Sequence, residues 1–155
     1  AQLRLKGPTT KSSQVPDAAK NFEDTQTREL PDIMAPRHMP EKTAKAFNNL
    51  CLIHVQQDNM QDAKTCFERA IALDPKHAGA WNNLGNILQR QNKYGEAIDC
   101  YRNSVASNPM YVRAFFNLSQ TLSQSGEHQE ARKHLQRVLE LDPQHSEARA
   151  AIEKH

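Results

Sequence analysis

The sequence has no long apolar run and no excess of charge of one sign. Its apolar stretches fall well short of the roughly 20 residues that a membrane-spanning helix requires. The 20 basic and 18 acidic side chains leave a net charge of +2. Such a balance does not favour binding to nucleic acid or to an anionic membrane surface. We therefore predict that neither is a partner of this chain.

Cysteine is scarce as well. Cys51, Cys66 and Cys100 are odd in number and lack any CxxC spacing, which argues against a disulfide framework and against a zinc site. We expect free thiols in a reducing compartment, and hence a cytoplasmic protein. Cys66 and Cys100 recur at one position of the repeats described below, which predicts a packing role rather than redox sensing.

Motifs for catalysis are missing too. The chain contains no GxSxG sequence, no phosphate-binding loop and no paired carboxylates at a meaningful spacing. The seven histidines form no ligand pattern, and His77 and His145 lie near expected helix starts, where a solvated surface position or a capping role is favoured over metal ligation. These absences predict a protein that is not an enzyme and that binds neither a cofactor nor a metal.

What the chain does contain is an internal repeat. Pro75, Pro109 and Pro143 are 34 residues apart, and the residues before each proline recur in register. Position 3 is always alanine, position 4 aromatic, position 7 leucine and position 20 alanine. The repeats span residues 44–77, 78–111 and 112–145.

The middle repeat resembles the tetratricopeptide repeat, in which an aromatic residue, Leu-Gly, Ala-x3-Phe and Pro occur within 34 positions. Its matching residues are Trp81, Leu84, Gly85, Ala97, Tyr101 and Pro109. The flanking repeats depart further from the pattern, with Cys51 and Ser119 at the glycine position. The resemblance covers residues 44–155 and implies an all-α, right-handed superhelical solenoid of three helical hairpins plus a C-terminal capping helix.

The chain divides into a tail and a repeat domain. Residues 1–40 hold five of the eight prolines and no sustained helical period, which predicts an extended or disordered tail. His38-Met39 is typical of a cloning scar, which favours a partly foreign tail. Residues 41–155 are expected to form the repeat domain, with a helix A and a helix B in each repeat and a polar-faced capping helix at 146–155. Turns are expected at 58–59, 92–93 and 126–127, and each helix B should end before its proline.

Asparagine occupies position 6 of every helix A, as Asn49, Asn83 and Asn117. On a helical wheel, positions 4, 7 and 11 form the core arc, and positions 2, 6, 9 and 13 lie nearly opposite. Asparagine in a helix costs about 0.6 kcal/mol relative to alanine, so helix propensity does not explain the three residues. A carboxamide can donate to and accept from any backbone. The column therefore predicts a surface that holds an extended peptide.

The rest of this predicted peptide-binding face is polar, slightly basic and free of acidic residues. Asn48 and Asn82 are expected at the edge of the groove, and Phe116 is expected to offer an apolar contact. The remaining predicted contacts are Lys45, Asn86, Arg90, Arg113, Gln120 and Gln124.

The face resembles the asparagine ladders of O-GlcNAc transferase repeat regions, which implies backbone contacts to a protein ligand. It departs from the tetratricopeptide domains that clamp chaperone C-terminal carboxylates, because Asn48 and Leu52 replace the lysine and asparagine of their first repeat. A carboxylate clamp is therefore not predicted. An alternative role for the three asparagines is hydration, or hydrogen bonding to a neighbouring helix that sets the superhelical twist.

These observations predict a non-enzymatic interaction module that binds an extended peptide of a partner protein in its concave groove, as an adaptor, scaffold or substrate-recruiting domain. Two alternatives stay open. One is a self-assembling or complex-scaffolding unit that associates through its repeat ends. The other is a regulatory fragment of a larger enzyme, in which the N-terminal tail occupies the groove of its own or of a neighbouring molecule. Residues 30–34 are the most ligand-like stretch of that tail.

Overall fold

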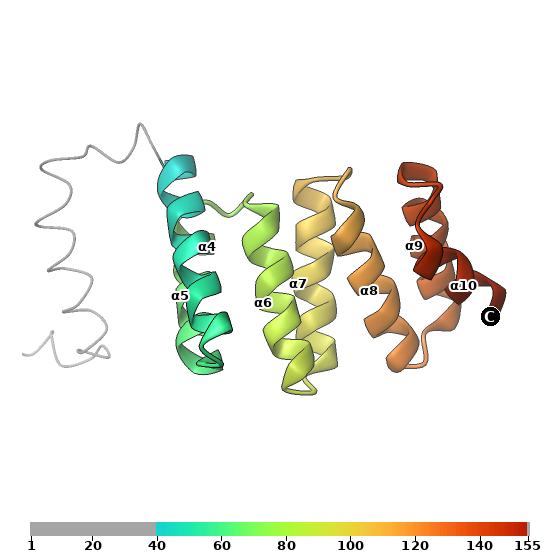
Figure 1. Cartoon of the computed structure of the whole chain (residues 1–155), viewed down its shortest axis with the longest axis horizontal. Helices are drawn as coiled ribbons and strands as arrows, with labels where there is room; N and C mark the ends of the chain where they lie inside the picture. The colour runs from blue at the N-terminus through green and yellow to red at the C-terminus, as the bar shows by residue number, and fades with distance from the viewer. Residues whose placement is uncertain (1–39, 155) are drawn as a thin grey trace, which may run out of the picture. The chain divides into compact units, whose positions relative to one another are not determined.

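The computed structural model describes residues 40–154. The predicted tail, including its ligand-like stretch at 30–34, lies outside the described residues. Those residues form seven helices and no strand, which confirms the all-α repeat fold, and Figure 1 shows the helices following one another in a row. The helices are α4 (Pro40–Gln56), α5 (Met60–Leu73), α6 (Ala78–Arg90), α7 (Tyr94–Ser107), α8 (Val112–Gln124), α9 (His128–Leu141) and α10 (Ser146–Lys154).

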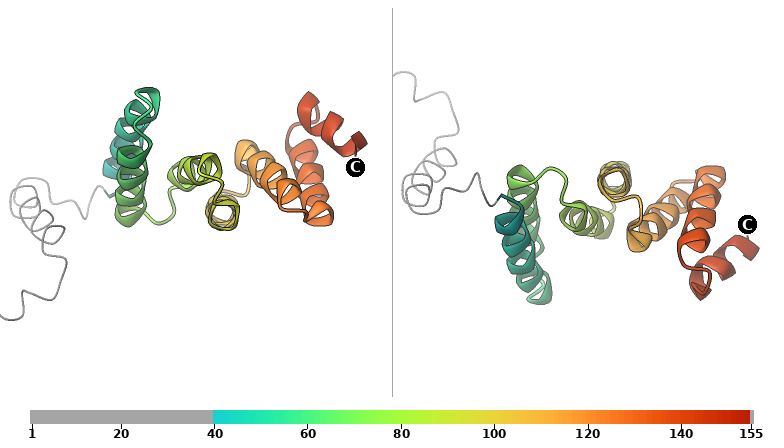
Figure 2. Two further views of the ribbon diagram at one scale, coloured as in Figure 1. Left: turned by 90° about the horizontal axis from the view of Figure 1, so that it is seen from below. Right: turned by 90° about the horizontal axis from the view of Figure 1, so that it is seen from above.

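Each repeat is a hairpin of two antiparallel helices. The hairpins are α4 with α5, α6 with α7 and α8 with α9, and each second helix also contacts the first helix of the next repeat. Figure 2 shows that successive hairpins are rotated relative to one another, because α6 and α7 are seen nearly end-on while the flanking pairs are inclined. This stepwise rotation is the twist expected of a helical repeat solenoid.

Position 15 closes each hairpin in the left-handed backbone region. The φ angles are 59° at Asp58, 63° at Asn92 and 88° at Gly126. Asp, Asn and Gly are the residues that adopt this region at the lowest cost. The turns predicted at these three places are therefore confirmed.

The helix ends also follow from local chemistry. Helices α5, α7 and α9 end at the residue before Asp74-Pro75, Asn108-Pro109 and Asp142-Pro143, because a residue before proline is pushed out of helical geometry. The imidazole Nδ1 of His77 then accepts the N–H of Ala80 at 3.0 Å, and that of His145 accepts the N–H of Ala148 at 3.2 Å. Of the two roles predicted for these histidines, a solvated surface position and capping, the structure shows capping.

The core lies between the helices of each hairpin and between neighbouring hairpins. Phe67 and Tyr101, at position 24 of two repeats, are fully buried. Gly85 faces the Tyr101 ring so closely that an added Cβ would lie 2.7 Å from the ring carbon Cε1. Glycine at this position therefore allows α6 and α7 to pack closely around the tyrosine.

The outer side of α4 differs from the prediction. Positions 3, 7 and 10 are buried in α6 and α8, but Leu50 and Ile53 on α4 are 49% and 47% exposed. The prediction that Leu50 is a core residue is therefore wrong. The reason is that no described helix covers this side of α4, which stands at the end of the described row in Figure 1.

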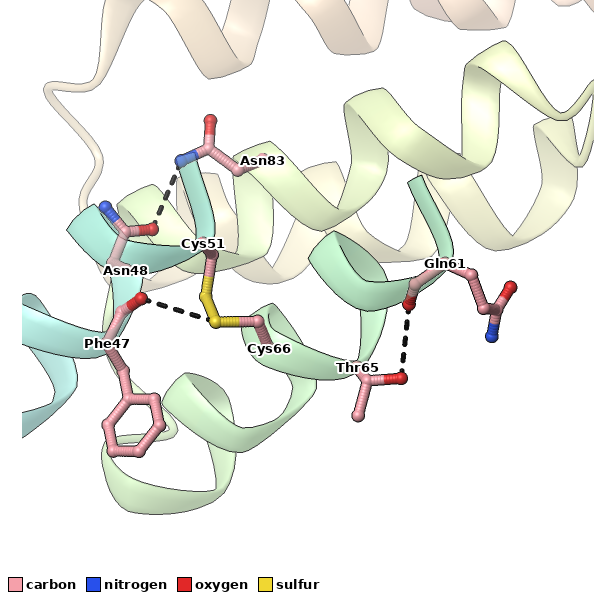
Figure 3. Close-up of a disulfide and its surroundings, with 7 residues drawn as sticks. All are labelled: Phe47, Asn48, Cys51, Gln61, Thr65, Cys66 and Asn83. Carbon is pink, nitrogen blue, oxygen red and sulfur yellow. Dashed lines mark hydrogen bonds between the residues drawn. A yellow bond between two sulfur atoms is a disulfide. The ribbon is translucent and has the colours of Figure 1, made fainter. Parts of the chain in front are cut away.

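The cysteine prediction is also wrong in part. Cys51 on α4 and Cys66 on α5 form a disulfide with a Cα–Cα distance of 5.3 Å (Figure 3). An odd cysteine count and the absence of CxxC say nothing about residues 15 apart that a helical hairpin brings face to face. Cys100 is buried and unpaired, so its predicted packing role is confirmed. The cysteines accordingly give no support to the expectation of a reducing, cytoplasmic compartment.

Candidate functional site

The A-helix face, defined here as positions 2, 6, 9 and 13 of α4, α6 and α8, carries the asparagine column. Asn49 is exposed, whereas Asn83 and Asn117 are half-buried. Nδ2 of Asn83 donates to Oδ1 of Asn48 at 3.1 Å. Nδ2 of Asn117 donates to Oδ1 of Asn82 at 3.0 Å and to Oδ1 of Asn86 at 3.1 Å. Each of these two asparagines therefore bonds to the preceding helix A.

The acceptors of these bonds are not where the sequence predicted them. Asn48 is 9% exposed and Asn82 is fully buried, so neither lies at the edge of the groove. Position 5 faces the next helix A of the stack, which a single-helix wheel cannot represent. Both residues are buried hydrogen-bond acceptors for the column and do not line the surface.

Asn86 is held from a second direction. The Tyr101 hydroxyl donates to Oδ1 of Asn86 at 2.7 Å, and it lies 2.9 Å from Oε1 of Gln89. Burial raises the pKa of Tyr101 well above its usual value, so the hydroxyl remains a donor at neutral pH. The core thus fixes the amide group of Asn86. From the sequence, Tyr101 is only a residue of the repeat pattern, because the partners of its hydroxyl belong to another helix.

This arrangement leaves one side of each half-buried amide available. Because Nδ2 is used within the protein, Oδ1 of Asn83 and Oδ1 of Asn117 can accept from a ligand. Figure 3 shows Asn83 with Nδ2 toward Asn48 and Oδ1 on the opposite side of the amide. The side chain of Asn49 makes no hydrogen bond within residues 40–154, so both of its groups can face a ligand.

The basic residues of the face are arranged unevenly. Lys45 and Arg113 are exposed. Arg90 is exposed too, but Nη2 lies 3.5 Å from Oδ1 of Asp58 and Nη1 lies 3.5 Å from the sulfur of Met60. An acidic side chain therefore borders a face that was predicted to be free of acids.

A cavity of about 590 Å³ lies beside α8, α9 and α10 at the far end of the face. It brings together three predicted contacts, Phe116, Gln120 and Gln124. Its other lining residues were not predicted from the sequence, because the last helix was expected only to cap the stack. These are Ser119, Ser123, Leu135, Glu147, Ala150, Ala151 and Lys154.

The asparagine column stops at this cavity. Position 6 of α10 would be Ala151, and positions 2 and 9 are Glu147 and Lys154. The Phe116 ring lies beside the His145 ring, with centroids 4.7 Å apart. This end therefore offers apolar carbon between charged side chains of both signs.

The described residues show neither a metal site nor a membrane span. Within residues 40–154, no three His, Cys, Asp or Glu side chains are placed to hold a metal ion. No helix in that range has the length and apolar character to cross a bilayer.

Stacked 34-residue helical hairpins with a repeated polar stripe along their first helices define an α-helical solenoid of the kind that generally serves as a protein-interaction module. The chain belongs to the tetratricopeptide repeat family, whose model matches residues 42–107 and residues 76–144. No match was found among curated proteins.

Solved structures share this fold. The first tetratricopeptide domain of Spaghetti (RPAP3), bound to the HSP90 peptide SRMEEVD, is 24% identical, covers 73% of this chain and 90% of its own, and has a TM-score of 0.70. YrrB, described as having an unusual peptide-binding site, is 24% identical over 68% of this chain and 55% of its own, with a TM-score of 0.64. An O-GlcNAc transferase from Thermobaculum terrenum is 23% identical over 74% of this chain and 22% of its own, with a TM-score of 0.66.

Proposed function

We propose that this protein is a non-enzymatic module that binds an extended segment of a partner protein along its A-helix face. The observation that carries the proposal is the asparagine column, in which Asn83 and Asn117 are held by the preceding helix with their carboxamide oxygens left for a ligand. An acceptor that is already fixed loses little conformational entropy on binding. It can therefore bond a backbone N–H at low cost.

The spacing of the asparagines along the column suits such a ligand. Neighbouring A helices in packed repeats lie about 10 Å apart, which corresponds to about three residues of extended chain. Backbone contacts at this interval select an extended conformation rather than one sequence. Sequence preference would come from the cavity at α10, where Phe116 and Leu135 offer an apolar contact to a ligand side chain.

Peptide binding by RPAP3 and by YrrB supports the proposal at the level of the shared fold. A chaperone carboxylate is not the proposed ligand of this chain. Asn48, which takes the place of a clamp lysine, is buried and bonded to Asn83. The ligand we propose is an internal, extended segment.

A peptide array tests this function. Asn49→Ala is the cleanest variant, because Asn49 is exposed and its removal breaks no hydrogen bond within the described residues. For the peptide of the array that binds most tightly, we expect the loss of each asparagine side chain of the column to weaken binding by about three- to tenfold. Asn103→Ala is the matched control, since it removes an exposed asparagine from helix B.

The triple variant Asn49/Asn83/Asn117→Ala should lose binding further while unfolding at a somewhat lower temperature, because the three hydrogen bonds that Asn83 and Asn117 donate join neighbouring repeats. Equal affinity of wild type and Asn49→Ala would remove the column from the proposed site. Binding lost only in step with unfolding would assign the asparagines to repeat stacking.

A second candidate function is self-assembly, and the exposed side of α4 favours it. Leu50 and Ile53 are about half exposed where the same positions of α6 and α8 are buried. Two copies could pair these α4 faces about a two-fold axis and bury both. The other end of the stack is unlike it, since α10 presents Arg149 and Glu153 to solvent.

Light scattering over a concentration series tests the pairing. Wild type should shift from monomer to dimer as concentration rises, and Leu50→Glu with Ile53→Glu should remain monomeric at every concentration. Met110→Glu is the control, because Met110 is an exposed apolar residue elsewhere on the chain. A wild type that remains monomeric throughout would exclude this function.

A further inference from the structure

The first repeat alone among the three carries a covalent link between its helices. Cys51 on α4 is at position 8 of the repeat, and Cys66 on α5 is at position 23. Their Cα atoms are 5.3 Å apart. Cys51 is fully buried and Cys66 is 8% exposed. The same two positions hold Gly85 and Cys100 in the second repeat and Ser119 and His134 in the third.

The link lies in the hairpin at one end of the described stack. Helix α4 packs against α5, but no described helix covers its other side, where Leu50 and Ile53 are exposed. In repeat proteins, stability comes from a repeat and its neighbours. A disulfide stabilises a short hairpin by restricting the unfolded chain. It therefore holds α4 on α5, while no described helix covers the other side of α4.

The disulfide is also close to Asn49, the first asparagine of the column. Asn48 lies one helical turn before Cys51, and its Oδ1 accepts the Nδ2 hydrogen of Asn83. Figure 3 shows the disulfide, Asn48 and Asn83 together at this junction. Asn49 belongs to the same turn of α4. Any movement of this turn displaces Asn49 and withdraws Asn48 from Asn83.

We propose that the Cys51–Cys66 disulfide is a redox-sensitive lock on the A-helix face, an inference that rests on the function proposed above. With the disulfide formed, α4 stays packed on α5, and Asn49 stays in register with Asn83, the next asparagine of the column. A dithiol reductant opens the lock. The freed α4 then departs from its position more often, and binding of an extended peptide weakens.

The reaction balances as an exchange of one disulfide for another. A thiolate of the dithiol attacks Sγ of Cys66, which is the more exposed of the two cysteines, and forms a mixed disulfide with it. The bond to Cys51 breaks, and the Cys51 thiolate leaves and takes up a proton. The second thiol of the reductant then attacks the mixed disulfide, releases Cys66 as a thiol and closes the cyclic disulfide of the oxidised reductant.

The third cysteine does not interfere with this exchange. Cys100 is buried on α7, and burial raises the pKa of its thiol to about 12. It therefore remains a protonated thiol at neutral pH, and a thiol in that form is a poor nucleophile toward a disulfide. The lock is confined to the first repeat.

Hydrogen exchange with and without dithiothreitol tests the lock directly. We expect reduction to speed amide exchange in α4 and α5 by about a hundredfold, the gain in opening that a disulfide over so short a loop suppresses, with α8 and α9 unchanged. Cys51→Ser with Cys66→Ser should exchange like the reduced protein whether or not dithiothreitol is present. Cys100→Ser is the control and should respond like wild type.

Binding of the tightest array peptide is measured on the same samples. Weaker binding after reduction, absent in Cys51→Ser with Cys66→Ser, supports the lock. Free thiols at Cys51 and Cys66 under non-reducing alkylation, or equal exchange in both states, would overturn it. Faster exchange with unchanged binding would overturn the coupling if Asn49→Ala does weaken binding. If no peptide binds the oxidised protein, the proposed function fails, and exchange alone decides whether the lock exists.

Discussion

At the scale of single residues, small differences in side-chain volume decide how closely the helices pack. Tyr101 is fully buried, and its ring fills the space that the missing side chain of Gly85 leaves. Its hydroxyl then reaches Asn86 on the same helix as Gly85. One glycine therefore determines both the packing of the second hairpin and the support of the A-helix face.

Replacing Gly85 with alanine tests this packing. The new Cβ would lie 2.7 Å from Cε1 and 2.9 Å from Cδ1 of Tyr101, so we expect the free energy of unfolding to fall by about 1–3 kcal/mol. Gly95→Ala is the matched control, because nothing lies within 4 Å of its added Cβ. On helix propensity it should gain up to about 1 kcal/mol. Denaturant unfolding measures both, and a Gly85→Ala protein as stable as wild type would contradict the packing described.

His134 should make stability depend on pH. It is partly buried beside the Phe115 ring, and burial lowers its pKa although Oε1 of Glu130 lies 3.6 Å away. Below the usual histidine pKa of about 6.5, the unfolded chain binds a proton that the folded chain resists. Stability from this residue is therefore present above that pH and is lost as pH falls.

Urea unfolding at pH 7.5 and at pH 5.5 measures the effect. His134→Gln should lose less stability than wild type between these two conditions, because glutamine does not titrate. Comparing the two proteins cancels the titration of the other histidines. An identical pH dependence in both would show that His134 is not responsible.

At the scale of helices and hairpins, the sequence predicted what depends on local chemistry. Turn residues such as Asn92, the prolines after each helix B, and the capping histidines all act within a few residues of their own position. What it did not predict depends on a second helix. The helical wheel placed Asn48 correctly on α4, but it could not show that α6 buries that position. The pairing of Cys51 with Cys66 required the hairpin geometry in the same way.

The turn at Asn92 provides a test at this scale. Its φ of 63° lies in the left-handed region, which glycine enters freely, asparagine at modest cost and alanine at a cost of about 1 kcal/mol. We expect the thermal unfolding temperature to be highest for Asn92→Gly, intermediate for wild type and lowest for Asn92→Ala. Lys93→Ala, an exposed neighbour at the helix start, should change little. An Asn92→Ala protein that unfolds with or above wild type would contradict the turn geometry.

At the scale of the whole repeat domain, the buried residues form two clusters, and the half-buried Val105 packs against both. One cluster of buried residues runs from the first repeat to α9, and a second, smaller cluster joins α8, α9 and α10. The exposed α4 side and the disulfide belong to one end, and the α10 cavity belongs to the other. In a stack that is stabilised between neighbours, each end can loosen without the other. A peptide that spans the A-helix face would contact both and couple them.

Because the two ends can loosen separately, a destabilising substitution in α10 should affect the helices next to it and not those at the other end. Ala148 is fully buried against the second cluster, so Ala148→Glu would place a charge in apolar surroundings, and we expect α10 to detach at a cost of about 2 kcal/mol or more. Hydrogen exchange should then speed up in α8 and α9 and remain unchanged in α4 and α5. Ser146→Glu adds the same charge at an exposed position of α10 and should leave exchange as it is. If α4 and α5 loosened equally with α8 and α9, the domain would be one cooperative unit, and reduction of the Cys51–Cys66 disulfide would then loosen every repeat instead of the first alone.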